Sequence, residues 1–363
     1  MKAIVMHRAN EPLTVEDVEL DDPIAGEVQI KMAASGVCHS CLHAWDASWG
    51  EMAVPMVLGD EGAGVVEKVG PGVSRLKPGD HVIVSWAPAC GHCRPCASGR
   101  PVLCELDIPF GYGTDGKVRM HLNGQDLYHY GPATYASQLI VSETCAVKIR
   151  PDMPLDKAAL IGCSVMTGAG AVLNTANAKA GDSVAVFGCG GVGLNAVQGG
   201  RLAGAYPLIA VDVADNKLEY ARAMGATHTV NAANQDVAAE IKRITGNGVD
   251  YAVVAVGSTK AIHQAWESLG RGGTVVMIGL PPKGDMITLD PFSLVSFGNE
   301  RRFVASRYGS ARIFDDFPRM VDLYMAGSLK IDELITKVYS IDEANEGFRA
   351  LAAGENARGL IVF

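Results

Sequence analysis

Four of the nine cysteines lie within a single short segment. Cys90, Cys93, Cys96 and Cys104 are separated by two, two and seven residues. Tight turns in a segment of this spacing direct thiolates toward one tetrahedral centre, as in zinc sites that only support structure. Four cysteine ligands leave no open coordination position, so we expect a structural zinc that does not react. An iron–sulfur cluster is the rival interpretation, and His92 inside the segment is expected to be a bystander.

A glycine-rich turn marks a second candidate site. It follows the apolar strand predicted for residues 183–187 and precedes a predicted helix. Gly188 permits a tight turn, Gly190 lets the backbone approach a pyrophosphate, and Gly193 lets the helix pack on the strand. The helix N-terminus would offer N–H groups and the positive end of its dipole to the phosphates. The cofactor-binding residues predicted here are Gly188, Gly190, Gly191, Val192 and Gly193.

An acidic residue ends the next predicted strand. Asp212 lies 19 residues after Gly193, where a carboxylate accepts hydrogen bonds from the ribose hydroxyls of a bound adenosine. A carboxylate would repel the 2′-phosphate of NADP, and Val213 and Ala214 supply no compensating cation. Lys217 either caps the ribose or lies in solvent. The pattern therefore predicts NAD as the cofactor, against the alternative of a non-binding glycine-rich turn.

The two candidate sites lie in parts of the chain that have different sequence patterns. A chain of 363 residues suggests two domains. Up to about residue 150, short apolar runs separated by turn signals indicate a β-rich domain. From about 165 to 304, apolar strands alternate with amphipathic helices, which is typical of a parallel sheet. The strands predicted there are 183–187, 208–211, 251–256 and 274–278; the helices are 192–203, 215–224, 236–244 and 260–269. The final stretch predicts helices near 314–325 and 341–352 and a last strand at 359–363.

The composition of the chain limits the kinds of molecule that we expect it to bind. The net charge is −9 and no basic stripe stands out, so we expect no nucleic-acid partner. No apolar run approaches the length of about 20 residues that a membrane helix needs, and the N-terminus does not read as a signal peptide. We expect a cytoplasmic protein. In that setting, crowded cysteines favour metal binding over disulfides.

Further motifs follow in a fixed order along the chain. They are Cys38-His39-Ser40 with His43, Gly59-x-Glu61 with Gly64, the four-cysteine segment, Gly162-Cys163, and Gly188–Gly193. This order resembles the zinc-dependent medium-chain alcohol dehydrogenases over essentially the whole chain. Residues 160–197 are most similar to the glutathione-dependent formaldehyde dehydrogenase branch.

The resemblance implies an α/β fold in two parts. A β-rich GroES-like catalytic domain would comprise residues 1–164 and 305–363, with a structural-zinc lobe at 88–106. A Rossmann domain, which is a doubly wound parallel sheet that binds NAD, would be inserted as residues 165–304. The resemblance also implies hydride transfer between an alcohol carbon and the nicotinamide, with a catalytic zinc as Lewis acid.

The resemblance also assigns roles to individual residues. Cys38 and Cys163 match two ligands of the catalytic zinc, and Glu61 matches the carboxylate behind the metal. Ser40 matches the hydroxyl that takes the alcohol proton, and His43 matches the relay histidine that passes it to solvent. The alternative for Ser40 is a serine that only forms a turn, and the alternative for His43 is a histidine packed in the core.

Two more residues match positions that contact the cofactor. His39 matches a group that lies at the pyrophosphate. Arg358, five residues before the C-terminus, matches an arginine that also grips phosphate. A surface cation is the alternative interpretation of Arg358.

The chain departs from the family at one pair of positions. The family's third zinc ligand is a histidine, where this sequence has Asp60, and its partner is an aspartate, where this sequence has Cys41. Aspartate is a competent zinc ligand, so we expect a catalytic metal on Cys38, Asp60 and Cys163. Two thiolates and a carboxylate leave the zinc site with a net charge of −1, which weakens the Lewis acid. A different ligand set, using Cys41 or Glu61, and the absence of a catalytic metal are the alternatives.

Large apolar residues fall at positions that line the family's substrate pocket. They are Trp49, Trp86 and Leu280, and they suggest a bulky apolar or aromatic substrate. Either tryptophan could instead pack in a core. Ile108 occupies the position at which the formaldehyde branch has an arginine for the glutathione carboxylate, which argues against a glutathione adduct.

The function expected from these observations is that of an NAD-dependent alcohol dehydrogenase or carbonyl reductase with one structural and one catalytic zinc. The alternative is a relative without catalytic zinc that reduces an activated C=C bond or an atypical carbonyl. A binding protein that has lost turnover is a third class. We also expect a homodimer, in which the apolar run Thr274–Leu280 continues the sheet across a two-fold axis.

Overall fold

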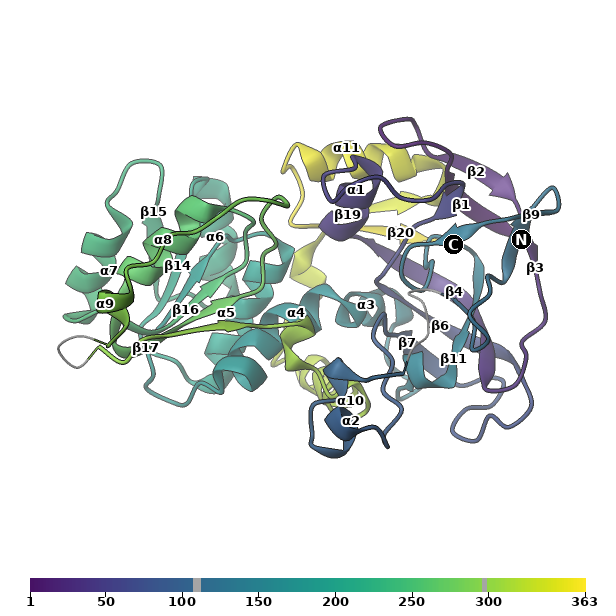
Figure 1. Ribbon diagram of the computed structural model, residues 1–363, viewed down its shortest axis with the longest axis horizontal. Coiled ribbons are helices and arrows are strands. Elements are labelled where there is room, and N and C mark those ends of the chain that lie inside the picture. Colours follow the sequence, from purple (N-terminus) through teal and green to yellow (C-terminus); the bar gives the residue numbers. More distant parts are fainter. Residues whose placement is uncertain (107–111, 296–298) are drawn as a thin grey trace. The chain divides into compact units, whose positions relative to one another are not determined.

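The chain divides into two compact units. The computed structural model describes residues 1–106, 112–295 and 299–363 (Figure 1). One unit comprises Met1–Cys163 and Arg312–Phe363, and the other comprises Ser164–Ala311. The sequence placed the second boundary at 304/305. The structure places it at 311/312, because the turn Tyr308–Ser310 packs on a helix of the second unit and stays with it.

The first unit is built mainly of antiparallel strands. Its largest sheet has seven strands in the order β12-β7-β6-β4-β20-β19, with β11 also paired to β4. The strands are β4 (Glu27–Val37), β6 (Gly62–Val69), β7 (His81–Val84), β11 (Gln138–Ser142), β12 (Ala146–Lys148), β19 (Ile335–Ser340) and β20 (Arg358–Val362). The C-terminal β20 lies antiparallel to β4, so that residues from the two ends of the chain become neighbours.

Two smaller sheets complete the strands of this unit. One has the order β10-β5-β1-β2 and the other has the order β3-β8-β9. Their strands are β1 (Lys2–Met6), β2 (Thr14–Asp17), β3 (Glu19–Leu20), β5 (Met56–Val57), β8 (Met120–Leu122), β9 (Gln125–Asp126) and β10 (Tyr128–His129). The β-rich character expected for this part of the chain is confirmed.

The first unit also contains helices of 4 to 13 residues. They are α1 (His39–Trp45), α2 (Arg94–Ala97), α3 (Leu155–Ala159), α10 (Ile313–Met325) and α11 (Ala344–Ala352). The helix predicted for 341–352 begins with a 3-10 turn, Ile341–Glu343, at which Ser340 and Glu343 form a capping box that satisfies free N–H groups. Only then does it continue as α11.

The second unit is a six-stranded parallel sheet with helices. The strand order is β15-β14-β13-β16-β17-β18, which is the order of a Rossmann fold. The strands are β13 (Val184–Phe187), β14 (Leu208–Asp212), β15 (His228–Asn231), β16 (Val249–Val254), β17 (Leu269–Met277) and β18 (Arg302–Ala305). The helices are α4 (Ser164–Gly170), which continues as a π-helical turn at Ala171–Ala176, α5 (Gly191–Ala203), α6 (Asp215–Met224), α7 (Val237–Thr245), α8 (Thr259–Glu267) and α9 (Pro291–Val295). The predicted fold class is confirmed.

The edge of this sheet differs from the expectation. Thr274–Leu280 was expected to be free to pair with a second copy, but β17 is paired on both sides, with β16 and with β18. The described sheet edges are β15 and β18. β18 was not predicted from the sequence, because Arg302–Ala305 has only three consecutive apolar residues and follows a charged segment.

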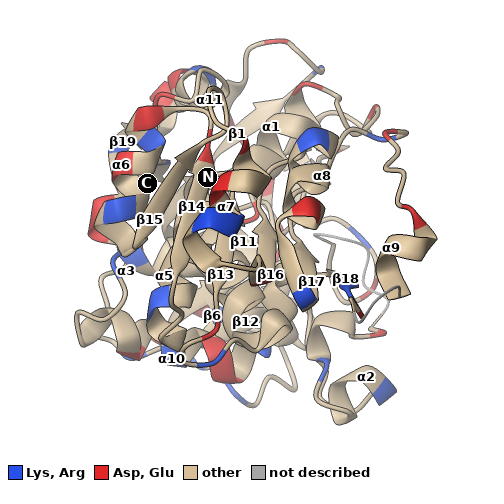
Figure 2. Cartoon of the chain, turned by 90° about the vertical axis from the view of Figure 1, so that its left-hand side faces the viewer, with Lys and Arg blue, Asp and Glu red and all other residues tan. Residues whose placement is uncertain are grey.

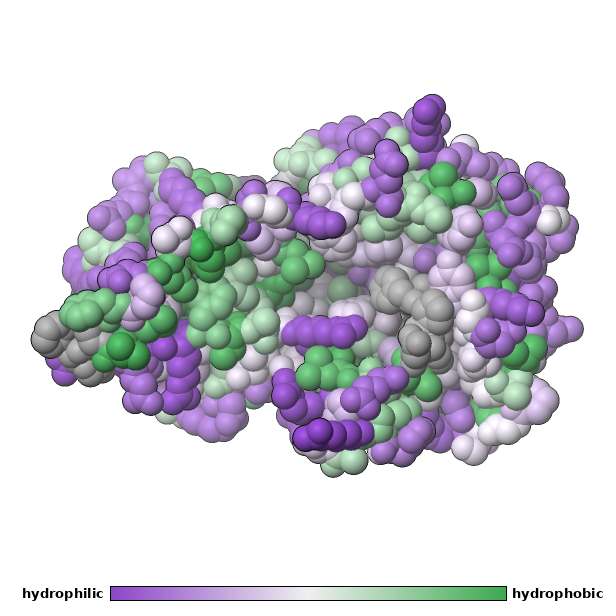
Figure 3. Space-filling view, viewed as in Figure 1, coloured by the Kyte–Doolittle hydropathy of each residue, from purple (hydrophilic) through white to green (hydrophobic). Residues whose placement is uncertain are grey.

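The surface shows two further features. Lys and Arg are interspersed with Asp and Glu on the face drawn in Figure 2. Apolar residues gather where α9 lies (Figure 3); Phe292 and Val295 of α9 are exposed, and so is Met286, which precedes it in the chain. In the described residues, no single helix has the length and apolar composition to cross a membrane; only the bent pair Leu155–Gly162 and Ser164–Ala176 passes that test when joined.

Candidate active site

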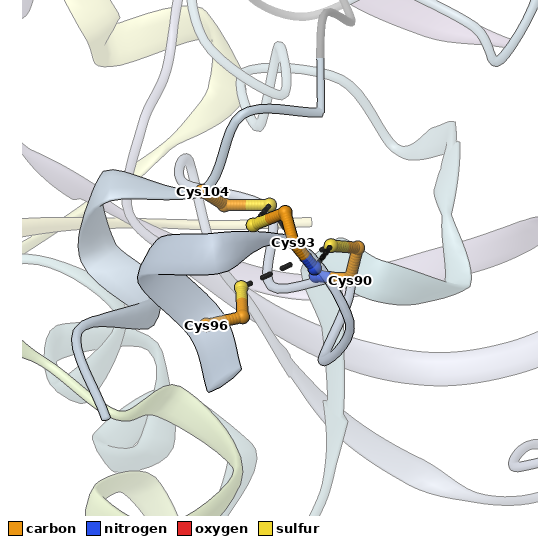
Figure 4. A group of neighbouring side chains, drawn as sticks. All are labelled: Cys90, Cys93, Cys96 and Cys104. Carbon is orange, nitrogen blue, oxygen red and sulfur yellow. Dashed lines mark hydrogen bonds between the residues drawn. The ribbon is translucent and has the colours of Figure 1, made fainter. Parts of the chain in front are cut away.

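The four lobe cysteines come together as the spacing predicts (Figure 4). Their sulfur atoms all lie within 4.8 Å of one another, and the Cys90–Cys96 and Cys93–Cys104 sulfur pairs are each 3.9 Å apart. A tetrahedral zinc with bonds of about 2.3 Å separates its sulfur ligands by about 3.8 Å, so the cluster fits that ion.

Backbone N–H groups support the lobe cysteines. The N–H of Cys93 donates to Cys90 Sγ at 3.4 Å, and that of Glu105 donates to Cys93 Sγ at 3.5 Å. The Glu105 N–H lowers the pKa of the Cys93 thiol, which favours the thiolate that a metal needs. The His92 ring hydrogen-bonds the carbonyl of Cys90 and is not among the grouped metal donors, whereas the backbone of His92 hydrogen-bonds the Cys90 sulfur. The lobe is a structural four-cysteine zinc site.

A second cluster brings together residues that are far apart in sequence. The sulfurs of Cys38 and Cys163 and a carboxylate oxygen of Asp60 all lie within 4.8 Å of one another. Cys38 follows β4 directly, Asp60 precedes β6, and Cys163 follows a 3-10 turn at Leu160–Gly162. All three side chains are buried. The three ligands expected for a catalytic metal therefore converge in one place.

The charge of this cluster calls for a cation. Burial and the neighbouring Cys38 raise the pKa of Asp60 to about 7, while Ser40 and Arg358 act in the opposite direction. Burying several acidic groups together is costly unless a positive partner compensates them. Two sulfurs and a carboxylate oxygen form a donor set that zinc accepts, so the residues present fit that ion.

Hydrogen bonds hold the backbone on both sides of Asp60. The N–H of Thr134 donates to Gly59 O at 3.1 Å, and Ser35 Oγ donates to Glu61 O at 2.9 Å. Gly59 has a φ of +114°, and a Cβ there would collide with Thr134. Only glycine fits this position without strain, so the backbone holds Asp60 in a fixed place.

Ser40 lies directly beside these donor groups. Its hydroxyl makes a short hydrogen bond to Asp60 Oδ2 and lies 3.1 Å from Cys38 Sγ. Ser40 also hydrogen-bonds the phenol of Tyr130, whose pKa is raised by burial and by Asp60. Tyr130 was not singled out from the sequence, where no motif distinguishes it.

His43 has other neighbours. Its Nδ1 lies 3.1 Å from Ser48 Oγ and its ring centroid lies 5.0 Å from that of Trp49. The role of His43 as the relay histidine stays a prediction. His39 is exposed, with its ring 6.1 Å from that of His43. Its contact with a pyrophosphate stays a prediction.

Cys41 is not one of the grouped donors. It is completely buried, and its Sγ lies 3.6 Å from Asp60 Oδ1. It also hydrogen-bonds Tyr135, whose phenol donates to Gly36 O at 3.2 Å. Among the described residues, the donor atoms of Cys38, Asp60 and Cys163 therefore form one group, and Cys41 contacts Asp60 without belonging to that group.

Glu61 and Arg358 form a buried ion pair next to this cluster. Both side chains are almost fully inaccessible to solvent. Gly36 lacks a Cβ where the Glu61 carboxylate lies, and a side chain there would collide with it. Arg358 is therefore not a surface cation. Its expected contact with phosphate stays a prediction, since its guanidinium lies against Glu61.

The predicted pocket residues have different surroundings. Trp86 is partly buried and packs against the core of its unit, and Trp49 lies against His43. Leu280, in the other unit, is 62% exposed. Ile108 lies outside the described residues. The substrate-binding role of Trp49, Trp86 and Leu280 stays a prediction.

The glycine-rich turn has the geometry expected of a cofactor loop. Gly188 has a φ of +89°, and a Cβ on Gly193 would collide with Gly188 O. A Cβ on Gly190 would meet nothing within 4 Å, which is the open space that an approaching ligand needs. Gly190 is the N-cap of α5, and Gly191, Val192 and Gly193 form the first turn of that helix.

Asp212 is tied to this turn. Its Oδ2 accepts from the N–H of Cys189 at 2.7 Å, and its Oδ1 accepts from Val213 and Ala214 at 2.8 and 3.1 Å. The carboxylate at the end of β14 thus lies at the glycine-rich turn, and its contact with the ribose hydroxyls stays a prediction. Lys217, in α6, is partly buried.

Comparison with known proteins identifies the family. Residues 24–151 match the alcohol dehydrogenase GroES-like domain, and residues 191–326 match the zinc-binding dehydrogenase family. The NDMA-dependent alcohol dehydrogenase of Amycolatopsis methanolica is 42% identical over 99% of this chain and 98% of that protein. The S-(hydroxymethyl)glutathione dehydrogenase of Paracoccus denitrificans is 40% identical over 100% of this chain and 99% of that protein.

Solved structures agree with this result. The benzyl alcohol dehydrogenase of Acinetobacter calcoaceticus has a TM-score of 0.93 at 30% identity, covering 100% of this chain and 99% of that one. The chain belongs to the zinc-binding medium-chain alcohol dehydrogenase family, and it is an oxidoreductase of that type. The resemblance inferred from the motifs is confirmed.

Proposed function

We propose that this enzyme is an NAD-dependent alcohol dehydrogenase or carbonyl reductase for bulky apolar or aromatic substrates. The observation that supports it best is the convergence of Cys38, Asp60 and Cys163 beside Ser40. These three residues would hold a catalytic zinc. When bound, zinc supplies a Lewis acid for the substrate oxygen.

The proton of the alcohol needs an acceptor beside these donors. Ser40 hydrogen-bonds Asp60, and a lone pair of Ser40 Oγ would accept the proton of a substrate hydroxyl while Ser40 gives up its own hydroxyl proton to the relay that ends at His43. His43 is partly exposed and would release the proton to solvent. Because His43 Nδ1 is held by Ser48, the other ring nitrogen is the one that would face the relay.

NAD is the proposed cofactor. Gly188, Gly190 and the start of α5 would bind the pyrophosphate, and Asp212 would accept from the ribose hydroxyls. The carboxylate of Asp212 argues against a 2′-phosphate at the same position. His39 and Arg358 are proposed to add contacts to the phosphates, and Lys217 is proposed to lie near the ribose.

An aromatic alcohol or aldehyde is the proposed substrate. Trp49 and Trp86 supply large apolar surfaces, and Leu280 is proposed to lie beside the nicotinamide. The similarity to a benzyl alcohol dehydrogenase favours the same class of substrate. Relatives named for S-(hydroxymethyl)glutathione make that adduct the natural competitor, which Ile108 would disfavour.

We further propose a cytoplasmic homodimer. The edge strand β18 and the exposed residues Met286, Phe292 and Val295 would form its interface. Light scattering at micromolar concentration tests this proposal, and a monomer would contradict it.

Metal content and turnover test the main proposal together. The purified chain should hold two zinc ions and oxidise benzyl alcohol with NAD, much faster than with NADP. S-(hydroxymethyl)glutathione should be a poor substrate. Because one relative is named NDMA-dependent, turnover is measured with and without NDMA. One zinc per chain, together with reduction of an activated C=C bond, would favour the metal-free alternative instead.

A further inference from the structure

Two consecutive residues of one helix hold the carboxylate of Asp60. Ser40 donates to Oδ2, and the Sγ of Cys41 lies 3.6 Å from Oδ1, within the range of a thiol hydrogen bond. Both belong to α1, which begins directly after Cys38. The two carboxylate oxygens therefore each face a separate donor from the same helical turn.

A ligating carboxylate needs partners of a particular kind. A histidine ligand donates its second ring N–H and so requires an acceptor behind it. An ionised carboxylate has no proton to donate and can only accept. A hydrogen-bond donor must therefore lie behind Asp60, and an S–H group meets that requirement where a second carboxylate would not.

Burial makes Cys41 the natural candidate. Its side chain is 0% exposed, and Asp60 is 4% exposed, so bulk water has little access to Oδ1. The Cys41 sulfur lies outside the group of mutually close donor atoms formed by Cys38, Asp60 and Cys163. The Cys41 sulfur therefore lies where a group can hydrogen-bond the metal ligand Asp60 without contacting the metal.

We propose that Cys41 is a positioning residue that donates its S–H to Asp60 and thereby fixes this carboxylate as a metal ligand. The proposal rests on the metal site proposed above at Cys38, Asp60 and Cys163. It assigns to Cys41 an effect on metal affinity and on the coordination geometry, with no direct contact between its sulfur and the metal.

Zinc affinity tests the proposal directly. Zinc competition with a chromophoric chelator is measured for the intact chain and for Cys41→Ala, Cys41→Val and Cys41→Ser. Cys41→Ala should weaken binding at the second site by about 10- to 100-fold, as for the loss of other groups that orient metal ligands. Cys41→Val should do the same without leaving a cavity. Cys41→Ser retains a donor and should bind zinc nearly as tightly as the parent.

The Co²⁺-substituted protein provides a second readout. The visible absorption bands of Co²⁺ at this site should change in Cys41→Ala and Cys41→Val and be preserved in Cys41→Ser. Ala44→Gly is the matched control, because Ala44 is a buried residue of the same helix and makes no hydrogen bond to Asp60. It should weaken the helix without changing zinc affinity.

The outcomes separate this proposal from the proposed function. A parent chain with zinc only in the lobe refutes both. Two zinc ions in the parent with unchanged affinity in Cys41→Ala and Cys41→Val keep the metal site and refute the role of Cys41. Equal loss in Cys41→Ser and Cys41→Ala also refutes it, because a retained hydrogen-bond donor at this position would then have no effect on zinc affinity.

Discussion

Arg358, in the last strand, forms a buried ion pair with Glu61, which lies 297 positions earlier in the chain. The antiparallel pairing of β20 with β4 brings them together, because β4 also carries Gly36, whose missing side chain makes room for the Glu61 carboxylate. The two ends of the first unit are thus joined next to the proposed metal ligands.

Removing one member of this pair should be strongly destabilising. Glu61→Gln or Arg358→Met alone leaves a buried charge without its partner, at a cost of about 3–5 kcal/mol in the free energy of unfolding. The double variant removes both charges and should recover much of that loss. Urea unfolding measures the three values. Additive losses in the double variant would show that the two side chains do not act as a pair.

The lobe should lose its metal when one ligand is removed. Cys93→Ser should bind one zinc fewer per chain and expose the lobe to proteolysis, since four ligands close the site. Zinc counting by atomic absorption and limited trypsin digestion follow the change. His92→Ala is the control and should keep the full zinc count, because the substitution removes only the ring, which binds the Cys90 carbonyl, and leaves the backbone hydrogen bond to the Cys90 sulfur. A fully metallated, stable Cys93→Ser protein would disprove the assignment.

Cofactor preference should depend on the charge of Asp212. Asp212→Asn removes the negative charge and keeps one acceptor oxygen, so the side chain can still accept from Cys189 N–H or from Val213 N–H but not from both. It should weaken NAD binding and relatively favour NADP. Asp212→Gly should do the same and also loosen the turn. The ratio of kcat/KM for the two cofactors is the measurement, and equal use of both by the unmutated enzyme would contradict the prediction.

Local patterns could be predicted from the sequence, and the reason is physical. The four lobe cysteines lie within 15 residues, and the glycine-rich turn joins one strand to the next helix. Short-range backbone geometry determines both, so spacing alone is informative. Asp212 could be placed because βαβ units have a regular length.

Other features depend on contacts between distant segments. Nothing in the local sequence distinguishes Tyr130, because its hydrogen bond to Ser40 depends on how β10 and α1 pack. The pairing of Arg358 with Glu61 requires the register of β20 against β4. The sheet edge at β18 was not predicted, because the position of Arg302–Ala305 at the edge is determined by its pairing with β17 and not by an apolar pattern in the sequence.

The most unusual residue of the proposed site is Asp60, and its charge should influence the pH dependence of turnover. A carboxylate near a substrate hydroxyl disfavours loss of the hydroxyl proton, which raises the pKa of that hydroxyl. Replacing Asp60 by a neutral histidine removes one negative charge, so the pKa should fall. The rate of alcohol oxidation should then reach its half-maximal value at a lower pH.

The single variant Asp60→His is not expected to show this lowered pKa. The ring N–H of the new histidine would face the Cys41 thiol, which is a poor acceptor, and the ring would be badly oriented. The double variant Cys41→Asp with Asp60→His supplies a carboxylate acceptor and should bind two zinc ions per chain. Its pH profile for kcat should shift to lower pH relative to the parent. Two zinc ions in both proteins without such a shift would keep Asp60 as a ligand and rule out the effect of its charge.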